Sequence, residues 1–471
     1  MKHEYSGARV LAGALSGFLA VLVVGAGFGS SAVHAQEKDS KLESRIERLG
    51  KDLTPLGAER AGNEDGTIPD WTGGLGSPPE GYARGIEHFD PFPDDKILFT
   101  INKDSSAQYA ERLTPGQLAL LDKVPNFRMP VYVSRRSCYN DQEVYDAIAQ
   151  NASSARLIDD GNSVAGARLS IPFPFPKNGL EAIWNHQLRM NGFRLLGASA
   201  LATVNASGSY SLVRSKIEMI NRYANYEAPP LDELPDGVRS LAILETVEPP
   251  ANAGQVVLSL TPVNRKRDPR QLWVYAPGER RVRRVPDVGH DTPAADMGGM
   301  ITDDQLDSFN GSPDRYDWEL RGKKEIYIGY NSYRIHSHDL KYSEMLIPGT
   351  VNPDFMRYEL HRSWVVDAKL KPGQDHIYGR RTFYLDEDSW TVALADSYDR
   401  DGDLWRVELS GLMNWYALPT CMDTITIVHD LRSGRYVSLN MDNEEAIVDW
   451  YPEDITEDQF TASQIRRRGT R

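Results

Sequence analysis

Short runs in which apolar and polar residues alternate fill the second half of this 471-residue chain. Val256, Leu258 and Leu260 follow a period of two, and comparable runs lie at 272–275, 281–285, 326–330, 356–366, 378–385, 390–398, 404–409, 425–429 and 436–439. This period is typical of strands, and the turn residues between the runs are typical of hairpins. The pattern therefore predicts an antiparallel meander over residues 205–455 rather than parallel βαβ units.

A sheet of eight or more strands has to curl or close. Helical signals lie in the preceding segment 96–204: a Thr114-Pro115 helix start, apolar spacing over 142–150, and the same spacing over 180–191. These helices are the natural filler for the open side of the sheet. We therefore predict an α+β fold that is mainly antiparallel β, with a curved, open half-barrel sheet and helices packed on its concave side.

The first 35 residues have the features of a secretory signal peptide. Lys2 and Arg9 precede a stretch of apolar and small residues, and Val33 and Ala35 suit cleavage before Gln36. The alternative is an N-terminal membrane anchor, which the glycines within the stretch disfavour. We expect cleavage between Ala35 and Gln36 to release a periplasmic protein that does not itself span a membrane.

The N-terminal segment 36–95 begins with a short charged helix expected over 40–49, and residues 53–95 are rich in proline and glycine, which excludes a long helix or a central strand there. Trp71, Tyr82, Phe89 and Phe92 argue against disorder because aromatic side chains seek burial. We predict an irregular segment lying over the body of the protein, and a C-terminal tail over residues 456–471.

The net charge of −14 argues against nucleic acid or anionic lipid headgroups as the main partner. The chain has two cysteines, Cys138 and Cys421. In an oxidising compartment an isolated pair favours a disulfide, and the alternative is two buried free thiols.

Catalytic motifs are weak. His336 and His338 would point the same way on a strand, at a spacing that zinc sites use, and His361 and His376 lie on nearby predicted strands. The alternative is ordinary hydrogen-bonded histidines. Residues 399–403 resemble a calcium loop only superficially and predict a hairpin turn. Phosphate-binding and dinucleotide-binding glycine motifs do not occur after residue 35. We predict no catalytic residue, no metal and no cofactor.

Bulky aromatic side chains could form the wall of an apolar cavity in a curved sheet that helices fill only in part. Alternation does not decide which rings face inward. The candidate wall residues are Trp184, Trp273, Tyr275, Tyr327, Trp364, Phe383, Trp390, Trp405 and Trp415.

Five stretches, at 53–74, 171–186, 309–318, 380–390 and 404–406, resemble a bacterial periplasmic family known as domain of unknown function 1329. That family is similar to the lipoprotein carriers LolA and LolB. The resemblance implies an unclosed antiparallel barrel that holds a lipid or acyl chain against helices. It also implies partners such as an inner-membrane exporter or an outer-membrane protein, with a peripheral place at the outer membrane.

We favour a non-enzymatic periplasmic carrier that binds a lipid or acyl chain for envelope transport, as a lipoprotein-sorting protein does. One alternative is a periplasmic hydrolase or metal enzyme that uses His336, His338 and a carboxylate. The other is a non-catalytic subunit of an envelope export complex, docking through residues 53–95.

Overall fold

A computed structural model describes residues 40–286, 289–294 and 297–469. The chain divides into two units, Met1–Glu47 and Arg48–Arg471. Of the first unit, residues 40–46 are helical. The expected signal peptide and its cleavage site at Ala35 and Gln36 lie outside the described residues. No helix in the described part of the chain is long and apolar enough to cross a membrane.

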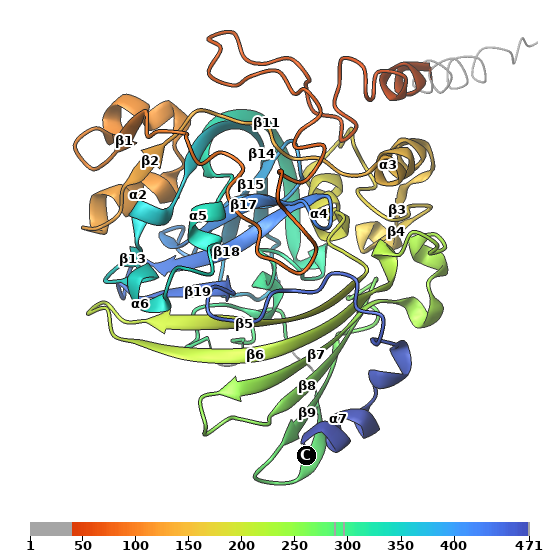
Figure 1. The fold of residues 1–471 in the computed structure, drawn as a ribbon. Helices are drawn as coiled ribbons and strands as arrows, with labels where there is room; N and C mark the ends of the chain where they lie inside the picture. The colour runs from red at the N-terminus through yellow and green to blue at the C-terminus, as the bar shows by residue number, and fades with distance from the viewer. Residues whose placement is uncertain (1–39, 287–288, 295–296, 470–471) are drawn as a thin grey trace, which may run out of the picture. The chain divides into compact units, whose positions relative to one another are not determined.

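One 15-stranded sheet organises the second unit (Figure 1). The long-strand pairings are antiparallel. The spatial order is β1 (Phe99–Ile101), β2 (Met129–Val131), β14 (Tyr358–Leu370), β15 (Arg380–Asp386), β16 (Val392–Tyr398), β17 (Leu404–Trp415), β18 (Thr420–Asp430), β19 (Tyr436–Met441), β5 (Arg194–Val204), β6 (Tyr210–Asn221), β7 (Val238–Glu248), β8 (Val256–Pro262), β9 (Gln271–Ala276) and β10 (Arg281–Val285), with β11 (Tyr316–Gly329) beside β14.

The sheet curls but stays open. β11 pairs along its length with β14, yet its last residue, Gly329, also reaches Gly411 of β17. A Cβ on Gly329 would lie 2.5 Å from the carbonyl oxygen of Ser410, so this approach requires glycine. At the other end, β10 pairs only with β9 among the described strands. The predicted curved, open and mainly antiparallel sheet is therefore confirmed.

Few helices accompany the sheet. They are α2 (Pro115–Lys123), α3 (Gln142–Ser154), α4 (Gly179–Leu188), α5 (Tyr333–His336), α6 (Tyr342–Met345) and α7 (Ala462–Gly469). The predicted start of α2 is present as a capping box, in which the Thr114 hydroxyl accepts from the Gln117 backbone N–H. α4 packs against β11 and β14, and α2 packs against β16 and β17.

The region expected to be helical, residues 96–204, is mixed. It holds α2, α3 and α4, but also β1, β2 and the small hairpin of β3 (Arg156–Ile158) and β4 (Ser163–Ala165). β5 already begins at Arg194, so the boundary expected at residue 205 is too late. The small residues of β5 hide its alternation, as described below.

The irregular segment before β1 is tied by hydrogen bonds to the chain around Cys138. Trp71 donates its indole N–H to the Cys138 carbonyl at 3.1 Å, and Leu75 N–H donates to the Ser137 carbonyl at 2.7 Å. Cys138 is joined by a disulfide to Cys421 of β18, 283 positions later.

Candidate functional site: a cavity on the inner face of the sheet

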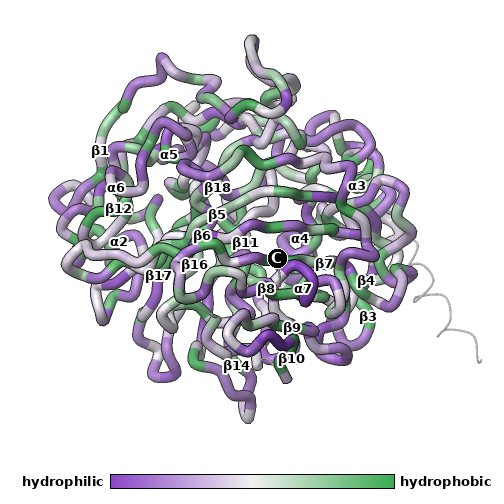
Figure 2. Tube along the Cα trace, turned by 60° about the horizontal axis from the view of Figure 1, so that its bottom comes forward, coloured by the Kyte–Doolittle hydropathy of each residue, from purple (hydrophilic) through white to green (hydrophobic). Residues whose placement is uncertain are grey.

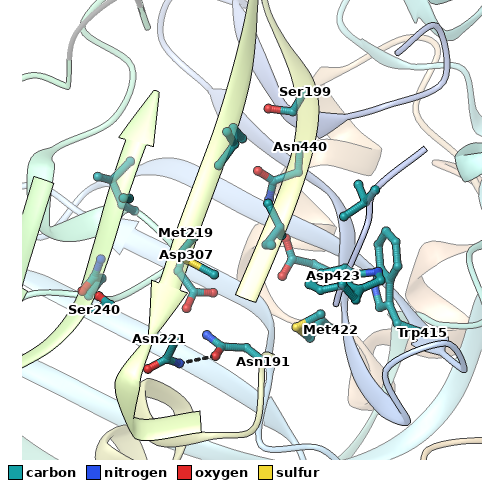
Figure 3. Close-up of a pocket in the computed structure, with 18 of the residues that line it drawn as sticks. Asn191, Ser199, Met219, Asn221, Ser240, Asp307, Trp415, Met422, Asp423 and Asn440 are labelled. Carbon is teal, nitrogen blue, oxygen red and sulfur yellow. Dashed lines mark hydrogen bonds between the residues drawn. The ribbon is translucent and has the colours of Figure 1, made fainter. Parts of the chain in front are cut away.

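A cavity of about 460 Å³ lies between two parts of the curved sheet. One wall comes from β5, β6 and β7, and the facing side comes from the ends of β17, β18 and β19 and from the segment after β19 (Figure 3). The C-terminal end of α4 borders it. This volume is within the usual range for pockets that bind small organic ligands.

The strand wall is built from cross-strand rows of apolar and small side chains. The register places Ile217 of β6 between Gly197 of β5 and Leu244 of β7. The next row, one alternation further along, consists of Leu195, Met219 and Ala242. All six residues line the cavity. Hydrophobic and hydrophilic stretches are interspersed along these strands (Figure 2), as expected where the two faces of a sheet meet different surroundings.

α7 packs on the other face of the sheet, mainly against β8, β9 and β10. Leu241 and Ile243 alternate with the cavity residues of β7, and they share a buried cluster with Ile465 of α7. α7 therefore packs on the face opposite the cavity. This arrangement leaves the cavity face of β5–β7 free of helix packing except near the end of α4.

One end of the cavity is polar. Arg189 and Asp307 form a two-pronged ion pair with distances of 2.6 and 3.0 Å, and Asn191 and Asn221 are hydrogen-bonded (Figure 3). Apolar side chains thus occupy one part of the wall, and amides and charged groups occupy another.

Arg239 of β7 lines this polar end without a carboxylate partner within ion-pair distance among the described residues. Its guanidinium donates to the Gln187 carbonyl at 2.8 Å and to Oδ1 of Asn310 at 3.0 Å, which are both neutral acceptors. Burial, followed by the nearby Arg265 guanidinium, lowers the pKa of Arg239 to about 10. The cation therefore remains charged at neutral pH but is poorly compensated.

Two carboxylates lie on the opposite wall. Asp423 of β18 accepts hydrogen bonds from the Thr426 hydroxyl and the Asn440 amide, and burial followed by the nearby Asp307 raises its pKa. Asp442, just after β19, lies 3.1 Å from Nδ1 of His336. Both side chains line the cavity.

Of the nine aromatic residues expected as cavity walls, the structure places Trp415 in this cavity. The others lie elsewhere. Trp184 is buried against β4 and donates to the Gly161 carbonyl, and Trp364 stacks on Trp390. Phe383 stacks on Trp318, Trp273 and Tyr275 belong to the α7 cluster, Tyr327 packs on Phe99 and Tyr109, and Trp405 lies beside Arg406 and Arg432.

The lining residues that the sequence did not point to include the small and aliphatic ones of β5–β7 and two further aromatic residues, Tyr223 and Trp450. A search for large rings could not find the small and aliphatic residues, because a wall that leaves room for a guest needs small side chains. A faint signal was present in the run Gly197-Ala198-Ser199, which puts three small residues in one strand.

The histidines do not lie on a strand as predicted. His336 ends the one-turn helix α5, and His338 follows in a loop. They nevertheless come together with Asp442, since one ligand atom of each lies within 4.8 Å of the others. Burial, followed by the charges of His336 and His338, lowers the pKa of neighbouring His88 to about 3.

The remaining predicted histidines lie in buried ion-pair networks. His361 groups with Asp386 and Asp388, but Arg136 already binds both oxygens of Asp388, at 2.7 and 2.8 Å. His376 lies 3.3 Å from Asp304, which Arg381 also binds. These sites hold the fold together and offer little to a ligand.

Comparisons with known proteins find a family, a relative and similar solved structures. The family model described as a protein of unknown function (DUF1329) matches residues 100–466. The chain is similar to the uncharacterized protein PA3922 of Pseudomonas aeruginosa, with 41% identity over 426 residues, covering 90% of this chain and 93% of that protein.

Three solved structures are similar at low sequence identity. A DUF1329 family protein from Desulfovibrio piger has a TM-score of 0.40 and 15% identity, covering 58% of this chain and 92% of that one. A putative outer membrane lipoprotein-sorting protein domain from Vibrio parahaemolyticus has a TM-score of 0.42 and 12% identity, covering 61% of this chain and 98% of that one. A LolA superfamily protein from Nitrosomonas europaea has a TM-score of 0.37 and 14% identity, covering 61% of this chain and 98% of that one.

Proposed function

This chain belongs to the DUF1329 family, as its motifs predicted, and we propose that it is a periplasmic carrier for an amphipathic lipid. The support for this role comes from its own cavity rather than from its family. The observation that carries this proposal is the double row of apolar side chains that β5, β6 and β7 present to a cavity of about 460 Å³. The acyl chain lies along these rows, and the polar head group lies at the Arg239 end.

Apolar burial gives such a site ample binding energy. About 12 methylenes at about 0.8 kcal/mol each provide roughly 10 kcal/mol before the cost of ordering the chain. A lipid held this firmly leaves slowly on its own. Unloading therefore requires a partner or a change in the cavity, and the sequence resemblance points to an exporter or an outer-membrane protein for that step.

The polar end suits a head group with acceptor oxygens. Arg239 presents a charged donor whose protein partners are neutral, whereas Arg189 is already neutralised by Asp307. The net charge of −14 acts over the whole surface and disfavours an anionic membrane, but a single carboxylate or phosphate beside Arg239 would meet a local cation and gain a charge-assisted hydrogen bond. An uncharged head group of the same size would not.

Lipid extraction tests the proposal. Wild-type protein, Arg239→Gln and the control Arg281→Gln, which changes an exposed residue of β10, are purified from cells. The proteins are then denatured in organic solvent for lipid mass spectrometry. We expect about one acidic lipid per wild-type and control molecule, and a several-fold loss of it from Arg239→Gln. Ligand-free wild-type protein from several preparations would refute the carrier, and an unchanged lipid in Arg239→Gln would refute the head-group assignment alone.

A further inference from the structure

Three histidines gather beside the cavity, next to Trp415. The rings of His336 and His338 lie 5.8 Å apart, those of His336 and His88 lie 6.0 Å apart, and His336 packs 5.0 Å from the Trp415 ring. The lipid carrier proposed above makes no use of these side chains. Their gathering therefore asks for a separate explanation.

Asp442 completes a set of donors with His336 and His338. One ligand atom of each of the three lies within 4.8 Å of the other two, a spacing that a single ion could bridge. Nδ1 of His336 is fixed from two sides, by Asp442 Oδ1 at 3.1 Å and by the Thr424 hydroxyl at 2.9 Å. Two imidazoles and one carboxylate, with positions left for water, form a donor set that zinc and related divalent ions use.

Charge distinguishes this cluster from the other histidine–carboxylate group. Arg136 and Arg362 compensate the carboxylates around His361, so an added cation would face permanent positive charge. Asp442 is 6% exposed, and its only ion-pair partner among the described residues is His336. A buried carboxylate without a lysine or arginine is normally paired in another way or bound to a metal.

Access is also different. His336 is 3% exposed, but His338 is only half-buried, so an ion can reach the donors from the His338 side. His88 is held by the Ala417 N–H, which donates to its Nε2 at 3.3 Å, and it therefore borders the donor set rather than joining it. Glu87 fixes the loop by accepting the His338 backbone N–H at 2.8 Å.

We propose that His336, His338 and Asp442 bind one divalent transition-metal ion of the zinc class at the edge of the cavity. The protein supplies three ligands, and water or a polar group of a guest completes the coordination. Because Asp442 also lines the cavity, the ion lies where it could contact the contents of the cavity. The assignment does not depend on what the cavity binds.

Zinc titration of chelator-stripped full-length protein tests the site. Isothermal calorimetry and elemental analysis of the desalted complex are expected to give one Zn²⁺ per chain. His338→Ala and Asp442→Asn are each expected to weaken binding at least tenfold. The control His290→Ala changes a half-buried histidine away from the cluster and is expected to bind like wild type.

Two variants guard against a folding artefact. His338 is partly exposed and its side chain can be removed without opening the core, whereas Asp442→Asn keeps the shape of a buried residue. Both are checked by circular dichroism in the metal-free state. Absence of saturable zinc binding by wild type, or binding that survives both substitutions, would overturn the proposal.

Discussion

At the residue scale, Asp396 of β16 shows how burial sets the pH response of this protein. Burial raises the pKa of Asp396 to about 7, although the Gly116 N–H of α2 donates to its Oδ2 at 3.1 Å and so opposes the rise. Glycine is required at position 116, because a Cβ there would overlap the Asp396 carboxyl. The carboxyl thus anchors the first turn of α2 to the sheet.

The expected consequence is a loss of stability as pH rises. The folded pKa of Asp396 lies above the unfolded value, so its favourable contribution is complete below about pH 4 and is lost as pH rises through about 7. Asp396→Asn cannot ionise. We expect the advantage of the variant over wild type in free energy of unfolding to be larger at pH 8 than at pH 5 by about 3 kcal/mol.

Denaturant unfolding at pH 5 and pH 8 measures this difference. Asp401→Asn, in the turn between β16 and β17, is the matched control because its side chain is exposed, and it should show no such trend. A difference between Asp396→Asn and wild type that is the same at both pH values would show that the carboxyl does not titrate in this range.

At the element scale, substitutions at two positions of β7 are expected to have different effects on ligand affinity. Ala242 faces the cavity in the row with Met219, whereas Val247, on the same strand, is 44% exposed and does not line the cavity. Ala242→Trp places a large ring in the space proposed for the acyl chain. We expect it to lower the affinity for a fluorescent fatty acid at least tenfold, while Val247→Trp leaves it unchanged.

Thermal unfolding of both tryptophan variants checks that they remain folded. We expect both to fold, because the cavity has room for a ring without moving the face of the strand that α7 contacts. Equal binding by Ala242→Trp and wild type, with both proteins folded, would show that the guest does not use this wall.

The strands differ in how well their sequences predicted them. β8, β9 and β10 and the strands from β14 to β19 alternate clearly, and the expected runs fall on the observed strands to within a few residues, apart from longer extensions of β17 and β18. β5 was missed because Leu196 and Leu201 are separated only by glycine, alanine and serine. The feature that obscures the strand is the one that makes room for the cavity.

The site was foreseen only in part, for a related reason. Trp415 lines the cavity, but Trp184, Trp364 and Trp390 pack in the core. Period-two alternation does not distinguish a strand face that packs in the core from one that lines a cavity. His336 and His338 meet although neither lies on a strand. Their third partner, Asp442, is more than 100 positions away, so only the folded sheet brings it there.

At the scale of the whole molecule, the Cys138–Cys421 disulfide closes a loop that includes β5, β6 and β7, the strands of one cavity wall, whereas most residues of the facing wall come after Cys421. It spans 283 positions, from the segment after β2 to β18. Chain entropy alone assigns about 5–6 kcal/mol to a loop of this length, and measured values are commonly lower. We expect the double variant Cys138→Ala/Cys421→Ala to lose about 2–5 kcal/mol in free energy of unfolding.

Urea unfolding of wild type and the double variant, each with and without a thiol reductant, separates the cross-link from the loss of two sulfur atoms. The reductant should destabilise wild type toward the double variant and leave the double variant unaffected. Cys138 also accepts a contact from the Tyr330 hydroxyl at 2.7 Å, so the single variant Tyr330→Phe reports the cost of that contact with the disulfide intact. If wild type and the double variant unfold at the same urea concentration under oxidising conditions, the folded sheet, and not the cross-link, holds the distant segments together.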